Sequence, residues 1–171
     1  TVNPTPSVNL VSNQTRCNGA TTNAVAFTGL VTGTVYNWTN SNPSIGLAAS
    51  GVGNIPSFTA TNTGTAPVTA TITVTPSFTN NGVTCTGTAI TFTITVNPSP
   101  TVNAVSNQVR CNGAAIAAIT LSSPTVGAVF NWTNSNPSIG LTALGTGNIP
   151  SFTAINTGTA PAVATITVTP S

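Results

Sequence analysis

The chain repeats one module, because residues 37–47, NWTNSNPSIGL, return without any change at residues 131–141. The similarity extends well beyond this block: residues 1–77 align with residues 95–171 without a gap, and most of the aligned positions are identical. Each copy is long enough to enclose a hydrophobic core of its own. The repeat therefore predicts two domains with the same fold.

Both copies carry the period-two pattern that is typical of β-strands. In residues 68–75 apolar Ala, Ile and Val alternate with threonines, which gives one apolar face and one hydroxyl-bearing face. Residues 89–96 repeat this alternation, and Asn-Asn-Gly at residues 80–82 predicts a hairpin that turns the chain into residues 83–86. No segment shows the helical period. We therefore expect an all-β fold.

The only two tryptophans, Trp38 and Trp132, lie at equivalent positions of the two copies. Each belongs to an alternating run that ends in a turn cluster of Asn, Ser and Pro, which predicts a central strand with its Trp in the core. With about seven short strands in the first copy, the pattern predicts tandem immunoglobulin-like β-sandwich domains. The predicted core residues are Trp38, Trp132, Ile72, Val74, Phe92 and Ile94.

A short connection divides the copies at residues 97–100, NPSP, and its two prolines predict a stiff joint. We expect one domain at residues 1–96 and the second at residues 97–171. The hairpin and closing strand of the first copy, residues 78–94, have no counterpart in the second, which predicts an incomplete second sandwich. Two explanations stay open: the sequence is a window on a longer array of repeats, or a neighbouring chain supplies the missing strand.

Ionisable side chains are almost absent, since Asp, Glu and His do not occur and the only cationic side chains are Arg16 and Arg110. General acid–base catalysis needs a group that titrates near the working pH, and a Ser or Thr nucleophile needs such a base beside it. Calcium and magnesium need carboxylates, zinc finds no imidazole here, and two arginines cannot neutralise a nucleic-acid backbone. We therefore expect no enzyme, no cofactor, no metal site and no nucleic-acid partner.

Membrane and export signals are missing from this stretch. No segment approaches the roughly 20 apolar residues that span a bilayer. The first residues, TVNPTP, have neither a basic head nor an apolar signal core. We expect no membrane span, and we expect any export signal to lie outside this segment.

Several short motifs point to a family. They are RCNG at residues 16–19, YNWT at 36–39, SFTA at 57–60, TATITVTP at 69–76 and TCTGT at 84–88. Together they resemble the tandem PKD-like repeats of very large cell-surface proteins of the Bacteroidota. The resemblance implies a secreted, immunoglobulin-like stalk or adhesin array, often attached to the cell surface. It supplies no functional site.

The first copy carries two cysteines, Cys17 and Cys85. In an exported domain the pair predicts a disulfide, and two free thiols are the alternative. Cys111 repeats Cys17 in the second copy, which has no counterpart of Cys85. We expect Cys111 to be free, or paired with a cysteine outside this segment.

Three asparagines, Asn13, Asn37 and Asn131, satisfy the Asn-x-Thr acceptor pattern for N-glycosylation. A chance match in a chain rich in Asn and Thr is the alternative. Asn37 and Asn131 precede the tryptophans, so they face outward if the tryptophans face the core. A covalent glycan is therefore sterically possible.

The residues favour a structural role with the chain itself as partner. Soluble β proteins keep sheet edges apart with lysines and inward-pointing charges, and this chain has neither. We expect a non-catalytic, self-associating repeat of an extracellular filament or surface stalk. The alternative is an adhesin module that binds carbohydrate or a host or surface ligand through the loops at residues 40–46 and 51–56.

Overall fold

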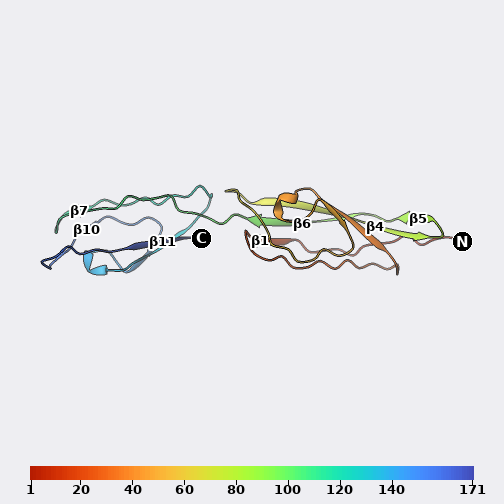
Figure 1. Cartoon of the computed structure of the whole chain (residues 1–171), viewed down its shortest axis with the longest axis horizontal. Helices are drawn as coiled ribbons and strands as arrows, with labels where there is room; N and C mark the ends of the chain where they lie inside the picture. The colour runs from red at the N-terminus through yellow and green to blue at the C-terminus, as the bar shows by residue number, and fades with distance from the viewer. The chain divides into compact units, whose positions relative to one another are not determined.

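The computed structural model describes every residue from Thr1 to Ser171 and divides the chain into two compact units, unit 1 (Thr1–Ser99) and unit 2 (Pro100–Ser171). Every regular element is a β-strand except for two short 3-10 helices (Figure 1). The expected all-β fold is thus confirmed. None of its helices is long and apolar enough to cross a membrane.

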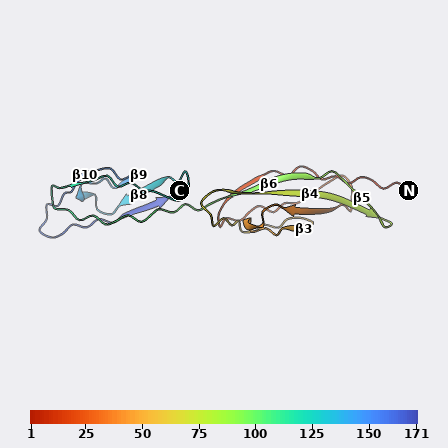
Figure 2. The ribbon, with the colours of Figure 1, turned by 90° about the horizontal axis from the view of Figure 1, so that it is seen from above.

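Unit 1 contains one main sheet. Its strands are β1 (Gln14–Cys17), β2 (Val35–Asn40), β3 (Ser50–Val52), β4 (Val68–Asn80), β5 (Val83–Thr86) and β6 (Ile90–Asn97). The order across the sheet is β1-β6-β4-β2-β3, and β5 pairs with the C-terminal end of β4. Only β1 and β6 pair in parallel. The central strand β4 runs beside β6 in both views (Figures 1 and 2).

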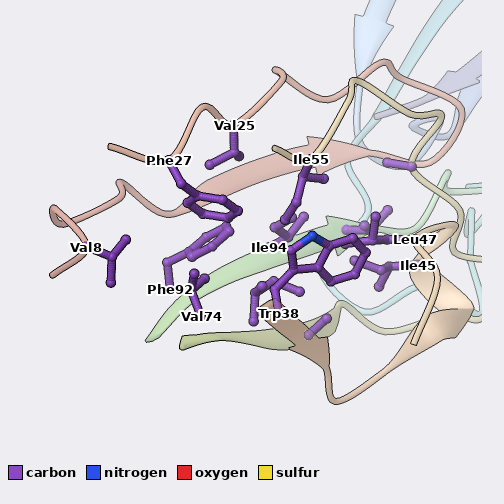
Figure 3. Close-up of a cluster of buried hydrophobic side chains, with 14 residues drawn as sticks. Val8, Val25, Phe27, Trp38, Ile45, Leu47, Ile55, Val74, Phe92 and Ile94 are labelled. Atoms are coloured by element: carbon purple, nitrogen blue, oxygen red, sulfur yellow. The ribbon is translucent and has the colours of Figure 1, made fainter. Parts of the chain in front are cut away.

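Extended segments outside the sheet form a second layer of unit 1. This layer is joined by isolated bridges, such as the one between Val25 and Ile55, and not by a continuous ladder. Figure 3 shows both side chains across the core from Ile94 and Trp38 of the sheet. Unit 1 is therefore sandwich-like, with one regular sheet and one loosely bridged layer.

The alternation of β4 and β6 decides which side chains enter this core. Ile72 and Val74 on β4 and Ile94 on β6 are 0% exposed, and Phe92 is 2% exposed. Successive side chains of a strand point to opposite faces, so the intervening threonines lie on the outward face. Trp38 on β2 completes the cluster and is 6% exposed.

The turn between β4 and β5 is a tight hairpin, as the Asn-Gly pair predicts. Asn81 and Gly82 adopt φ angles of 50° and 79°, which are the left-handed values of a type I′ turn. Asn80 pairs with Val83 at the hairpin end. Glycine adopts such an angle at little cost, and asparagine tolerates it better than most residues.

Unit 2 rebuilds part of this plan from the repeated sequence. Its strands are β7 (Ala115–Ile116), β8 (Phe130–Asn134), β9 (Leu144–Thr146), β10 (Phe152–Thr153) and β11 (Ile166–Pro170). One sheet has the order β11-β8-β9, and β10 pairs with β7. Its core includes Leu121, Phe130, Trp132, Leu141 and Ile149, all buried. In the alignment of the two copies, β8, β9 and β11 correspond to β2, β3 and part of β4, and β9 keeps only the central glycine of β3.

Pairing register is the same in the two units. Trp38 on β2 lies opposite Val74 on one side and Gly51 on the other. Trp132 on β8 lies opposite Val168 and Gly145, the equivalent residues. The shared Trp, Gly and Val positions therefore have the same register in both units.

The predicted disulfide between Cys17 and Cys85 is wrong, because all three cysteines are free. Cys17 ends β1 beside Asn97, at the end of β6 whose neighbouring residue Val96 pairs with Val68 at the start of β4. Cys85 instead pairs with Phe78, near the end of β4. Residues 68–78 of an extended strand separate the two thiols by about 30 Å. A disulfide needs Cα atoms about 4.4–6.8 Å apart.

Alkylation of folded, unreduced protein is therefore expected to modify all three thiols. Cys17 and Cys111 are exposed and should react with iodoacetamide faster than the half-buried Cys85. Peptide mapping by mass spectrometry measures the three rates. Recovery of a linked peptide containing Cys17 and Cys85 would contradict this placement. As a control, replacing Cys17 and Cys85 with serine should change the free energy of unfolding by no more than about 0.5 kcal/mol.

Candidate interaction surfaces

The outward face of the main sheet of unit 1 is a ladder of threonines. Across β4 and β6 the pairs are Thr69 with Thr95, Thr71 with Thr93 and Thr73 with Thr91. The hydroxyls of the first pair lie 2.9 Å apart and form a hydrogen bond. In unit 2, Thr133 on β8 lies opposite Thr167 on β11, as Thr39 on β2 lies opposite Thr73 on β4 in unit 1. Such a face offers hydrogen bonds and no net charge.

Short edge strands flank these faces. β3 and β9 end the sheets of units 1 and 2 on the side away from β4 and β11. Each exposes an apolar side chain: Val52 is 68% exposed and Leu144 is 70% exposed. Lysines and acidic residues, which natural proteins use to keep edges apart, are absent from the whole chain. Both edges can therefore accept another strand without charge repulsion.

The loop at residues 40–46, a candidate for ligand recognition, is held together by a buried asparagine. The Nδ2 of Asn40 donates to the carbonyl oxygens of Leu47 and Ala48 at 2.9 and 3.2 Å. Its Oδ1 accepts from the backbone N–H of Asn42 at 3.0 Å. Asn40 is 7% exposed, so these bonds satisfy a polar group inside the core.

Unit 2 repeats this network atom for atom. Asn134 donates to Leu141 and Thr142 at 2.9 and 3.3 Å and accepts from Asn136 at 3.0 Å. The identity of residues 37–47 and 131–141 thus has a structural cause, because the side-chain amide replaces missing backbone partners. Sequence reasoning missed this role. The signal was a polar residue in phase with the buried Trp of the same strand.

Replacing Asn40 with alanine should lower the free energy of unfolding of unit 1 by about 2–3 kcal/mol, because two carbonyls and one N–H lose a buried partner. Asn134→Ala should cost unit 2 a similar amount. The exposed Thr65→Ala is the matched control and should be neutral. Denaturant unfolding followed by hydrogen exchange of each unit measures the loss. Equal, negligible effects of all three changes would contradict the assigned role.

The three glycosylation candidates all lie at the surface. Asn13, Asn37 and Asn131 are exposed. The Nδ2 of Asn37, the atom to which a glycan would attach, donates to the Oγ of Ser77 at 3.2 Å. The Oδ1 of Asn13 accepts from the backbone N–H of Thr93 at 2.8 Å. The side chains of Asn13 and Asn37 therefore already bond to neighbouring strands of unit 1.

The two arginines bond to nearby backbone. Arg16 donates to the carbonyl oxygens of Thr21 and Thr15 at 3.2 and 2.9 Å. Arg110 donates to the carbonyl oxygen of Val109 at 2.8 Å and to the Oε1 of Gln108 at 3.2 Å. Both side chains act within their own turns, and the two guanidinium groups belong to different units.

Each tryptophan lies flat against a glycine of the edge strand. A Cβ at Gly51 would meet the ring carbons of Trp38, as a Cβ at Gly145 would meet those of Trp132. The Nε1 of both tryptophans is buried without a hydrogen-bond partner (Figure 3 shows that of Trp38 in blue). The indole rings therefore act as apolar filling and contribute no surface for stacking sugars.

No protein-family model and no curated protein matches the chain. Both units present neutral threonine faces and uncharged sheet edges, and both bury an equivalent Trp and Asn.

Proposed function

We propose that this chain is a non-catalytic structural repeat of an extracellular filament or surface stalk, and that its partner is another copy of itself. In this proposal the two units are tandem immunoglobulin-like, PKD-like sandwiches. The observation that carries it is the repetition of an uncharged, threonine-covered sheet face with an uncharged edge in both units. A contact that fits one unit recurs at the next.

Uncharged surfaces and repeated modules both favour assembly of the chain with itself. Neutral threonine faces meet without charge repulsion and bond through hydroxyls. A contact between two different surfaces of the same module leaves each surface free on the next copy, so it generates an open polymer unless the rotation closes a ring. Electron micrographs of native material should therefore show long fibres of uniform diameter. Dispersed single particles at all concentrations would contradict the proposal.

The adhesin alternative places recognition in the loops at residues 40–46 and 51–56. The internal amide network of Asn40 and Asn134 gives the repeated loop a structural reason, which favours the structural role. A glycan array separates the two proposals. Selective, saturable binding by the 171-residue chain would favour the adhesin, whereas a blank array alongside fibres supports the filament.

A further inference from the structure

Three Asn-Gly pairs occur in the chain, at residues 18–19, 81–82 and 112–113. Asparagine is a chemically labile residue, and it deamidates fastest before glycine, because glycine has no side chain to shield its backbone nitrogen. That nitrogen attacks the Cγ of the preceding asparagine. Whether the attack takes place in a folded chain depends on how firmly the two reacting groups are held by other bonds.

The pair at residues 18–19 of unit 1 is bonded at both reacting groups. The backbone N–H of Gly19 donates to the carbonyl oxygen of Ala60 at 2.8 Å. The Oδ1 of Asn18 accepts from the backbone N–H of Asn62, also at 2.8 Å. The attack at this pair therefore has to break two hydrogen bonds first.

The equivalent pair of unit 2, residues 112–113, repeats both bonds. The backbone N–H of Gly113 donates to the carbonyl oxygen of Ala154 at 2.8 Å. The Oδ1 of Asn112 accepts from the backbone N–H of Asn156 at 2.9 Å. Both turns therefore restrain the nitrogen that would attack and the amide that would be attacked.

The pair at residues 81–82, in the turn between β4 and β5, lacks these restraints. The backbone N–H of Gly82 forms no hydrogen bond, and residues 81–84 are all exposed. Asn81 is the only residue other than glycine with a positive φ, a conformation that L-residues adopt at some cost. Opening the turn disturbs only the pairing of Asn80 with Val83 at the hairpin end. The asparagine and the glycine can therefore rearrange without disturbing the core.

We propose that Asn81 is a self-modification site, which converts to aspartate and isoaspartate in the folded chain. The nitrogen of Gly82 forms a bond to the Cγ of Asn81, its proton passes through solvent to the amide nitrogen, and ammonia leaves. The product is a five-membered succinimide ring. Water then opens the ring at one of its two carbonyl carbons, which gives aspartate or isoaspartate. Water is the only other reactant, so no catalytic side chain is needed.

The conversion adds an acidic group to a chain that otherwise has no acidic side chain, and it lowers the formal net charge of +2 by one. The new carboxylate lies beside β5, a strand that pairs only with β4 and whose Val83 is 59% exposed. Charged groups at such positions keep sheet edges apart. The modification therefore places a charge at an uncharged edge, and it does not depend on whether the chain associates with itself.

The test incubates the folded 171-residue chain in mildly alkaline buffer made with oxygen-18 water, and peptide mapping by mass spectrometry follows the three pairs. We expect Asn81 to deamidate at least about 10-fold faster than Asn18 or Asn112, because each of these has two hydrogen bonds to break. The product should carry one oxygen-18 atom and contain both isomers, which opening of the ring produces. Equal rates at the three pairs, or a slower reaction at Asn81, would overturn the proposal.

The same chain in concentrated urea is the matched control. Unfolding removes the bonds that hold Asn18 and Asn112, so the three rates should become similar. An unchanged preference for Asn81 in urea would show that the neighbouring sequence selects the site, which would overturn the structural argument. The Asn81→Asp chain supplies a charge standard: one product of the folded chain should elute with it on ion exchange, and the variant itself should gain no further charge over the same period.

Discussion

Replacing Trp38 with alanine is expected to lower the free energy of unfolding of unit 1 by about 3–5 kcal/mol. The side chain is 6% exposed and lies at the centre of the core cluster of unit 1, so its loss leaves a cavity that the surrounding strands fill only in part. A small domain is stable by about 5–15 kcal/mol, so most of that stability is at stake. Denaturant unfolding, followed by the fluorescence of Trp132 for unit 2 and amide exchange for unit 1, measures the change.

Trp38→Phe should cost much less than Trp38→Ala. It keeps an aromatic ring in the core and removes the Nε1 hydrogen that lacks a partner. Gly51 supplies the coupling test, because its Cβ would overlap the indole ring. Gly51→Ala should cost about 1–3 kcal/mol beside Trp38 and almost nothing in the Trp38→Ala chain. Additive effects of the two changes would contradict the packing of ring against glycine.

Replacing Ile94 with asparagine should release β6 from unit 1. Ile94 is 0% exposed between β1 and β4, so the change removes apolar burial and places an amide without partners in the core. The first effect costs about 2–5 kcal/mol and the second about 1–3 kcal/mol. We expect rapid amide exchange throughout β6 and β1 and along the matching part of β4.

Thr93→Asn is the matched control for this change. Thr93 lies on the same strand, one residue away, and its side chain belongs to the outward face. The substitution should alter the free energy of unfolding by less than about 1 kcal/mol. Hydrogen exchange measured on both variants decides between them: if Ile94→Asn left β6 as protected as Thr93→Asn does, the strand would not depend on this core contact.

Local pattern predicted much of unit 1. The alternation in residues 68–75 gave the faces of β4, and the Asn-Gly pair at Asn81 gave the hairpin. Each of these signals acts between residues that are close in the sequence, or along a single strand. The exposed or buried state of a side chain then follows from its phase.

The pairing of strands that are far apart in the chain could not be predicted from the sequence. The parallel pairing of β1 with β6 joins residues 14–17 to residues 94–97, and no spacing in the chain indicates it. This explains the mistaken disulfide. The parallel pairing of β1 with β6 places Cys17 at one end of the sheet, and the hairpin places Cys85 at the other. Composition alone does not fix such geometry.

For the candidate surfaces, the absence of charged residues was more informative than any motif in the sequence. The lack of acids and lysines indicated uncharged edges before any strand was placed. The role of Asn40 was not predicted, because the sequence does not distinguish an asparagine that bonds loop carbonyls in the core from one that is exposed to solvent.

The most direct test of the central claim, self-association through uncharged surfaces, is sedimentation of the purified chain over a wide range of salt and protein concentration. We expect assemblies that grow with protein concentration and whose amount is almost unchanged by salt, because no pair of opposite charges exists among the side chains for ions to screen. Fibres that dissolve in moderate salt, or a chain that stays monomeric at every concentration, would contradict the account.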